Sequence, residues 1–260
     1  MSLTLDRTFR ASKVPPTIDG TFWVLKLLTT AMGEATSDFL VKNFNPEVAV
    51  CCTGLVFLIV IWRQLRAPRF FITTYWAAVI MVSVFGTMCA DVLHVQFGVP
   101  YVVSASSFAV LLVLIFNAWW RTEHTLSIHS ITSTRRELFY WATITITFAL
   151  GTAVGDMTAT TLNLGYLTSG IVFAFVFCLP SIGFWVFRLN AIAMFWMAYI
   201  LTRPLGASFA DYMGKPKSSG GLGWGDGHVS LLFSAIIFVI LATLVARHQR
   251  SVTSRARHAE

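Results

Sequence analysis

Long apolar runs alternate with short polar connections along the whole chain. Each run is long enough to cross, as a helix, a hydrocarbon core about 30 Å thick. We therefore predict an all-α, polytopic integral membrane protein with eight transmembrane helices. The predicted spans cover approximately residues 21–41, 48–64, 71–95, 100–120, 138–162, 165–187, 190–212 and 228–247.

Composition supports this class. The chain has 260 residues, of which 56% are hydrophobic and 12% are charged, and its mean hydropathy is +0.70. Soluble domains carry about 25% charged residues. The first 20 residues contain the Pro15-Pro16 pair and lack a short apolar region followed by a cleavage site. We therefore expect the first apolar run to be a retained span rather than a secretory signal.

The basic residues predict the orientation of the chain. With both termini in the cytoplasm, fourteen Lys and Arg residues lie on that side and three lie on the other, namely Lys42, Lys215 and Lys217. This asymmetry follows the positive-inside rule for a multi-pass membrane protein. The formal charge of +7 is thus a topology signal. We expect the lipid bilayer as a partner and no nucleic acid.

Four copies of one pattern occur along the chain. Stretches such as LGTAVGD end in an aspartate, with a glycine five residues before it and a tryptophan fifteen residues before it. The aspartates are Asp38, Asp91, Asp156 and Asp211, the glycines are Gly33, Gly86, Gly151 and Gly206, and the tryptophans are Trp23, Trp76, Trp141 and Trp196. We predict four parallel two-helix repeats at approximately 21–64, 71–120, 138–187 and 190–247, between cytoplasmic tails 1–20 and 248–260, in one transmembrane domain, 1–260.

The chain resembles a known family at this point. The pairs FW, YW, YW and FW with their downstream glycine and aspartate, and the linker TLSIHSITSTRRELFYW, are similar to bacterial membrane proteins built from four tandem repeats of unknown function, each with two membrane helices and a characteristic tryptophan. The resemblance covers nearly the whole chain. It implies the repeat architecture and a place in the bacterial cytoplasmic (inner) membrane, and little about activity.

The repeat predicts a layer of carboxylates inside the membrane. Fifteen helical residues rise roughly 22 Å, so the aspartates lie in the outer half of the bilayer at one depth. Small residues let membrane helices pack closely, so we assign the glycines to helix packing and expect the aspartates to face one axis. The tryptophans follow the basic loops, where aromatic anchors of the interface belong. One turn before the aspartates stand Glu34, Thr87, Thr152 and Ala207.

The chemistry of this layer is that of hard oxygen ligands. Carboxylates and hydroxyls suit Mg²⁺, Ca²⁺ or Mn²⁺, and His94, one turn after Asp91, could add an imidazole. Arg203 lies within the seventh span and should pair with one of the acids. Pro204 beside it is expected to kink the helix. We expect the four cysteines, Cys51, Cys52, Cys89 and Cys178, to be buried thiols. Serines near the starts of the even spans, such as Ser104, Ser106 and Ser107, offer a further polar lining.

Three functions are compatible with this pattern. The leading hypothesis is a transporter or channel for a divalent, Mn-like cation, with a site made of Glu34 and the four aspartates. The first alternative uses these carboxylates as proton relays for a small organic substrate, and the second is a non-transporting anchor or sensor. We expect no enzyme, since no nucleophile or metal–water motif is present. No cofactor is predicted beyond a divalent ion as substrate, and the oligomeric state, monomer or homo-oligomer, stays open.

Overall fold

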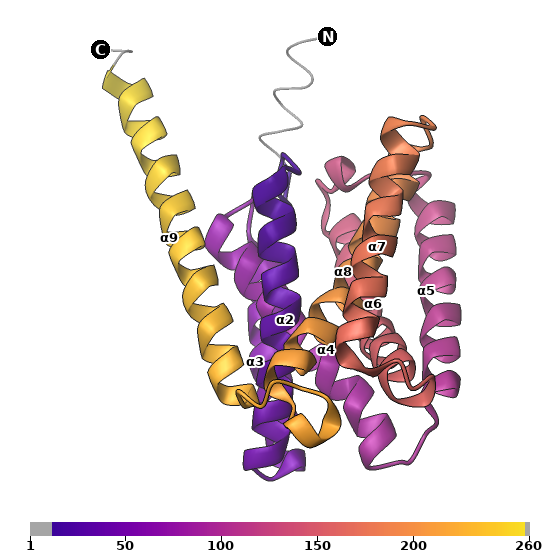
Figure 1. The fold of residues 1–260 in the computed structure, drawn as a ribbon. Coiled ribbons are helices and arrows are strands. Elements are labelled where there is room, and N and C mark those ends of the chain that lie inside the picture. Colours follow the sequence, from indigo (N-terminus) through magenta and orange to yellow (C-terminus); the bar gives the residue numbers. More distant parts are fainter. Residues whose placement is uncertain (1–11, 258–260) are drawn as a thin grey trace.

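The computed structural model describes residues 12–257 and shows an all-α chain (Figure 1). The all-α prediction is confirmed, and eight long helices lie where the eight spans were predicted. They are α2 (Gly20–Asn43), α3 (Pro46–Arg66), α4 (Ile72–Val95), α5 (Tyr101–Glu123), α6 (Thr134–Asp156), α7 (Gly165–Trp185), α8 (Ala191–Gly214) and α9 (Asp226–Arg257). Three short elements complete the order, namely η1 (Ile128–Ser130), the π-helical η2 (Met157–Thr161) and η3 (Lys217–Ser219).

Polar residues at the helix starts explain several of these boundaries. The side chain of Asp19 accepts a hydrogen bond from the backbone N–H of Phe22 over 3.0 Å at the start of α2. Asn45, Ser133 and Asn190 cap α3, α6 and α8 in the same way. Such caps satisfy backbone donors that have no partner within the helix. The apolar pattern and these caps together place the helix starts within a few residues of the prediction.

The chain is a multi-pass membrane protein. Among the described residues, six helices are long and apolar enough to cross a membrane, namely α3, α4, α5, α6 with η2, α7 and α9. The helices α2 and α8 do not belong to this group, and both carry charges within their length, such as Lys26 and Glu34 in α2 and Arg203 in α8. Such charges lower the mean hydropathy of a helix, although its length is still sufficient to cross a membrane.

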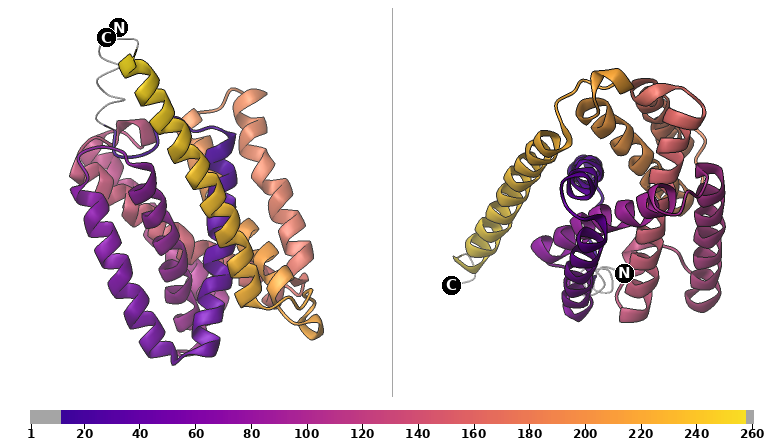
Figure 2. Two further views of the ribbon diagram at one scale, coloured as in Figure 1. Left: turned by 90° about the vertical axis from the view of Figure 1, so that its left-hand side faces the viewer. Right: turned by 90° about the horizontal axis from the view of Figure 1, so that it is seen from below.

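The eight helices alternate in direction, so both ends of the described chain lie at the same end of the bundle (Figure 1). The first helices of the four repeats, α2, α4, α6 and α8, contact one another in a closed ring. The second helices lie outside this ring. Each packs chiefly against the first helix of the next repeat: α3 on α4, α5 on α6, α7 on α8, and α9 back on α2. Figure 2 shows α9 running obliquely past α2.

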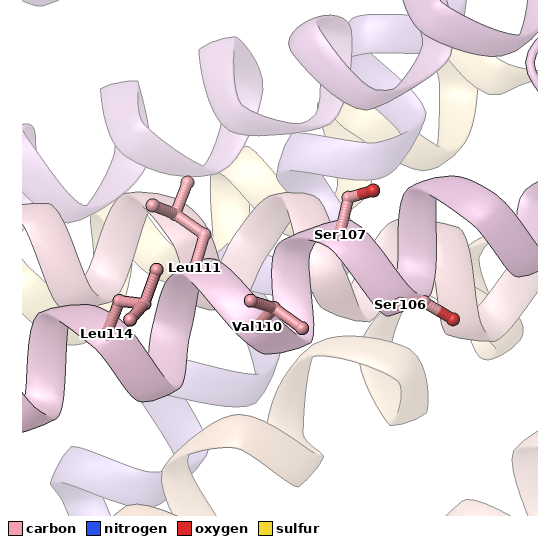
Figure 3. A pocket seen from close by; sticks show the side chains of 5 residues that line it. All are labelled: Ser106, Ser107, Val110, Leu111 and Leu114. Atoms are coloured by element: carbon pink, nitrogen blue, oxygen red, sulfur yellow. The ribbon is translucent and has the colours of Figure 1, made fainter.

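The outer helices carry large apolar side chains on their free faces. Trp185, Phe238 and Leu231 are among the most exposed. In a membrane protein such faces contact lipid. A shallow hollow on α5, lined by Ser106 and Ser107 with three apolar residues, belongs to this outer surface and not to a polar interior (Figure 3).

The expected burial of the cysteines was wrong for three of the four. Cys51, Cys52 and Cys178 are exposed on outer helices, and Cys89 is partly buried. The reason is physical. Lipid is as apolar as a protein core, so an apolar run does not distinguish a residue that faces lipid from one that faces another helix.

The repeat-related glycines hold the inner ring together. A Cβ atom on each glycine would collide with a side chain of the next inner helix, and the contacted residue always stands eight positions before the next aspartate. The pairs are Gly33 with Ser83, Gly86 with Phe148, Gly151 with Arg203, and Gly206 with Thr30. Each inner helix thus meets its neighbour at the same register, and the repeat of the sequence becomes an approximate fourfold arrangement about one axis.

Candidate cation site in the inner ring

A buried arginine lies between the four inner helices. The Nη2 atom of Arg203 donates to Glu34 Oε2 over 2.6 Å and to Thr152 Oγ1 over 2.6 Å, and it also contacts the hydroxyl of Thr87. Arg203 Nη1 donates to the backbone oxygen of Thr30 over 3.2 Å. Arg203 and Glu34 are 1% and 2% exposed. The sequence predicted an acid partner for Arg203, and the structure identifies Glu34.

These contacts follow from the repeat. Glu34, Thr87 and Thr152 each stand four residues before the aspartate of their own copy, while Arg203 stands eight before Asp211. The long side chain of Arg203, from the fourth copy, therefore reaches the layer formed by Glu34, Thr87 and Thr152 of the other three copies. Hydrogen bonds to a charged group are stronger than neutral ones, and here they engage both Nη atoms of the buried guanidinium. The Nε atom of Arg203 is buried without a hydrogen-bond partner among the described residues.

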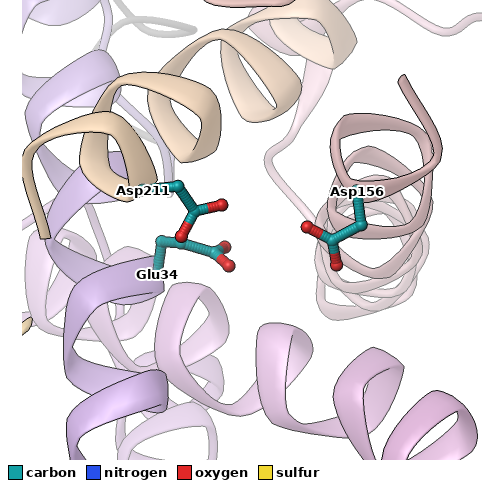
Figure 4. Close-up of side chains that lie close together, drawn as sticks. All are labelled: Glu34, Asp156 and Asp211. Carbon is teal, nitrogen blue, oxygen red and sulfur yellow. The ribbon is translucent and has the colours of Figure 1, made fainter. Parts of the chain in front are cut away.

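Three carboxylates converge next to this arginine. Glu34 of α2, Asp156 at the end of α6 and Asp211 of α8 each offer an oxygen atom, and these atoms lie within 4.8 Å of one another (Figure 4). Glu34 and Asp211 are buried, and Asp156 is partly buried. In the described part of the chain, Asp156 makes no hydrogen bond or ion pair through its side chain. Oxygen ligands from three helices are the donor set that Mg²⁺, Ca²⁺ and Mn²⁺ prefer.

The helix geometry changes at Asp156. The regular part of α6 ends at this residue, and the π-helical turn η2 begins at Met157. Thr158 and Thr160 donate their hydroxyls to the backbone oxygens of Gly155 and Asp156, over 2.7 and 2.6 Å. Single π-turns within helices frequently occur at functional sites. The wider turn sets the position of Asp156 at the edge of the ring.

The other two aspartates have partners of their own. Asp38 contacts the ammonium groups of Lys215 and Lys42, the latter at 3.0 Å. Asp91 accepts a hydrogen bond from Ser37 over 3.2 Å. The four aspartates are therefore not equivalent, although the repeat places them at one register. Two lie in the three-carboxylate group with Glu34, and two are engaged beside it.

Two lysines, Lys42 and Lys215, lie beside the carboxylates. Lys215 follows the last residue of α8 and lies 3.4 Å from Asp211 Oδ1, besides its contact with Asp38. Burial lowers the pKa of Lys215, but the carboxylates of Asp211 and Asp38 outweigh burial and raise it above its ordinary value. Lys42 also binds Asp226 at 2.6 Å. Six carboxyl groups, those of Glu34, the four repeat-related aspartates and Asp226, thus lie with three cationic groups, Arg203, Lys42 and Lys215, which gives the site a formal excess of negative charge.

A second buried cation, Lys26, was missed in the sequence analysis. It is 1% exposed, and its Nζ atom lies 3.9 Å from the ring centre of Phe148 and 4.3 Å from that of Tyr199. Within the described residues it has no hydrogen-bond acceptor and no carboxylate partner. Its spacing was the available signal, because Lys26, Thr30, Glu34 and Asp38 follow one another at four-residue intervals on one helix face. Lys26 and Arg203 both place positive charge within the inner bundle.

The expected role of the tryptophans was wrong for three of the four. Trp76, Trp141 and Trp196 are 3 to 4% exposed, and Trp23 is partly buried. The aromatic residue before each tryptophan contacts the tryptophan of the next repeat, with ring centres 5.7 to 6.2 Å apart. The pairs are Phe22 with Trp76, Tyr75 with Trp141, Tyr140 with Trp196, and Phe195 with Trp23.

These eight rings, the aromatic layer, close the inner bundle at the end where the chain termini lie. The hydroxyls of Tyr75 and Tyr140 are hydrogen-bonded over 2.6 Å at 0% exposure. The tryptophans are buried because the neighbouring inner helices and the outer helices cover them. Trp196, for example, also contacts Phe116 and Trp119 of α5. A tryptophan beside a basic loop is therefore not an anchor in lipid when its own repeat neighbours pack over it.

His94 lies outside the three-carboxylate group. Its Nδ1 is 2.7 Å from the backbone oxygen of Val99, and its Nε2 is 3.1 Å from Ser104 Oγ. Its ring stacks on Tyr101 at 3.8 Å between centres. Both ring nitrogens are thus used at the α4–α5 turn, and the expectation that His94 supports the cation site does not fit this structure.

The comparisons with known proteins agree with the repeat. The Repeat of Unknown Function (DUF347) matches residues 74–125, 139–188 and 194–250. These segments fall on the second, third and fourth predicted copies. Neither a curated protein nor a solved structure matches the chain.

Proposed function

We propose a transport function for this chain, which belongs to the family defined by the Repeat of Unknown Function (DUF347). In our proposal all eight helices cross the bacterial inner membrane as four parallel repeats in one domain, with both termini in the cytoplasm. The charge asymmetry of the loops supports this orientation. The carboxylate group then faces the outer side and the aromatic layer faces the cytoplasm.

The substrate we propose is a small cation, divalent and Mn-like. One observation carries the proposal: oxygens of Glu34, Asp156 and Asp211 meet within 4.8 Å. Acidic residues inside a membrane are costly and otherwise line ion or substrate pathways. A divalent ion would offset the excess negative charge and would take the hard oxygen ligands that it prefers.

Arg203 acts as an internal competitor in this proposal. Its guanidinium occupies Glu34 at 2.6 Å when no cation is bound. A cation that binds Glu34, Asp156 and Asp211 has to displace the guanidinium, because the Glu34 carboxylate cannot pair fully with Arg203 and with the cation at the same time. The hydroxyls of Thr87 and Thr152 then keep the displaced guanidinium hydrogen-bonded. Pro204, directly after Arg203, removes a backbone hydrogen bond of α8 and makes local movement easier.

A carrier fits the arrangement better than a channel. A cation that enters from the carboxylate side meets Arg203 and Lys26, and then the aromatic layer. Passage therefore requires a rearrangement that alternates access between the two ends. The same carboxylates could instead relay protons for a small organic substrate. A non-transporting anchor or sensor would use the group only to hold helices together, and we propose no enzymatic activity.

Binding to the purified protein in detergent tests the proposed site. Mn²⁺, Mg²⁺, Ca²⁺ and Zn²⁺ are titrated calorimetrically into wild type, Asp156→Asn and Glu47→Gln, the last being an exposed acid outside the site. We expect one of these cations to bind wild type and Glu47→Gln equally, and Asp156→Asn much more weakly. Equal binding to all three proteins would contradict the proposed site. Binding of no cation would favour the proton-relay or anchor alternatives.

A further inference from the structure

A short segment before α2 is buried at the end of the bundle where the termini lie. Ser12, Lys13, Val14 and Pro15 are all buried, and Val14 is 0% exposed. The segment is not helical, and the Pro15-Pro16 pair separates it from α2. We call residues 12–16 the strap. Because it is not a continuation of α2, it can move without unfolding that helix.

The strap is held by backbone hydrogen bonds to two different loops. The N–H of Lys13 donates to the backbone oxygen of Ile131 over 3.0 Å, and the N–H of Phe70 donates to the backbone oxygen of Ser12 over 2.8 Å. Ile131 precedes α6, and Phe70 precedes α4. The strap therefore ties the starts of two inner helices together.

A buried ion pair reinforces this contact. Lys13 Nζ lies 2.8 Å from Glu137 Oε2, and the two side chains are 9% and 0% exposed. Lys13 Nζ also donates to the backbone oxygen of Leu65 over 2.9 Å. Gln64 Nε2 donates to Glu137 Oε1 over 2.9 Å and to the backbone oxygen of Lys13 over 3.2 Å. The pair thus joins the strap to the end of α3 and the start of α6.

A pair of this kind is weak evidence for a purely stabilising role. Removing two charges from water costs several kcal/mol per ion, and apolar residues of the same volume often stabilise a fold as well or better. Buried ion pairs that persist can instead specify one of two arrangements. Glu137 is also connected to the aromatic layer, since Trp141 Nε1 donates to Glu137 Oε1 over 3.3 Å and the Trp141 ring contacts Tyr75.

We propose that the strap is a releasable lock on the cytoplasmic side of the transport pathway, with Glu137 as the receptor for the Lys13 ammonium. While Lys13 is bound, the starts of α4 and α6 are held together and the aromatic layer stays closed. Opening towards the cytoplasm requires Lys13 to leave Glu137. This inference rests on the transport function proposed above, and it adds a gate that is separate from the cation site.

Reversible cross-linking of the strap tests this lock. In a background with the four cysteines replaced by serine, Lys13→Cys and Glu137→Cys are combined and treated with a short, reducible bis-methanethiosulfonate. The two single-cysteine variants receive the same reagent as controls. Cation uptake into proteoliposomes and cation binding in detergent are measured before treatment, after treatment and after reduction.

We expect the linked protein to bind the cation, to stop transporting it, and to resume transport after reduction, while the single variants transport throughout. Uptake by the linked protein at the rate of the single variants would overturn the lock. Absence of both binding and transport in the cysteine-free background that keeps Lys13 and Glu137 would instead indicate that the proposed function has failed.

Discussion

Arg203 of α8 and Glu34 of α2 form an ion pair of 2.6 Å in which both side chains are almost completely buried. The pair joins the fourth repeat to the first and stands directly beside the carboxylates of Asp156 and Asp211. It is therefore both a structural link that closes the inner ring and, in our proposal, the ground state of the cation site. The two roles predict different responses to substitution.

Arg203→Gln should destabilise the protein strongly. The substitution leaves the Glu34 carboxylate buried without its cation, and breaking a buried pair in this way costs about 3–5 kcal/mol. The measurement is the unfolding free energy in detergent, with Arg121→Gln, an exposed arginine, as the control. Adding Glu34→Gln to Arg203→Gln should restore part of the loss. A double variant no more stable than the single one would contradict the pairing.

Gly151→Ala should destabilise the inner ring, whereas Gly155→Ala should be tolerated. A Cβ atom at Gly151 would collide with the Arg203 side chain and lie 3.0 Å from Pro204 Cδ. At Gly155 the nearest atom is Pro204 Cα, at an ordinary 3.7 Å. Overpacking of this kind costs about 1–3 kcal/mol. Thermal unfolding of both variants provides the comparison, and equal losses would show that the close contact at Gly151 is not specific.

Trp141→Ala should cost much more than Trp185→Ala. Trp141 is 3% exposed within the aromatic layer, while Trp185 is 75% exposed at the end of α7. Truncating a buried tryptophan typically costs about 3–5 kcal/mol. Trp185 faces outward, so its loss should change stability by only about 0.5 kcal/mol. Similar unfolding free energies for the two variants would mean that the layer does not close the bundle.

Lys26→Met should stabilise the protein. The ammonium lies between two aromatic faces with no acceptor among the described residues, and a buried polar group without a hydrogen bond costs about 1–3 kcal/mol. Methionine has a similar length and no charge. The exposed Lys217 is the control, and Lys217→Met should have little effect. Lower stability of Lys26→Met would show that attraction to the two aromatic rings exceeds the cost of burying the ammonium group.

The sequence predicted the architecture well because the repeat carries it. A glycine five residues before each aspartate and a side chain eight residues before the next one meet at every junction of the ring. Because the same contact recurs between each pair of neighbouring inner helices, only a few arrangements of the four parallel helices are possible. The apolar runs and their caps then place the starts of the eight helices to within a few residues, whereas α9 continues to Arg257, ten residues beyond the predicted span.

The arrangement of the site could not be predicted to the same depth. The repeat puts the four aspartates at one register, but it does not say that Lys215 and Lys42 engage Asp38, nor that a π-turn follows Asp156. Those differences arise from residues outside the repeated pattern. The environment of Trp76 was predicted wrongly for a related reason. A tryptophan that follows a basic loop can contact either lipid or a neighbouring repeat, and the sequence pattern is the same in both cases.

Cation uptake by proteoliposomes is the most direct test of the central claim, that Glu34, Asp156 and Asp211 form a transport site. Asp156→Asn is the informative variant, because Asp156 has no ion pair among the described residues and its loss should leave the fold intact. Glu47→Gln serves as the matched control outside the site. The account predicts that wild type and Glu47→Gln move the same cation and that folded Asp156→Asn does not. Undiminished uptake by Asp156→Asn would contradict it.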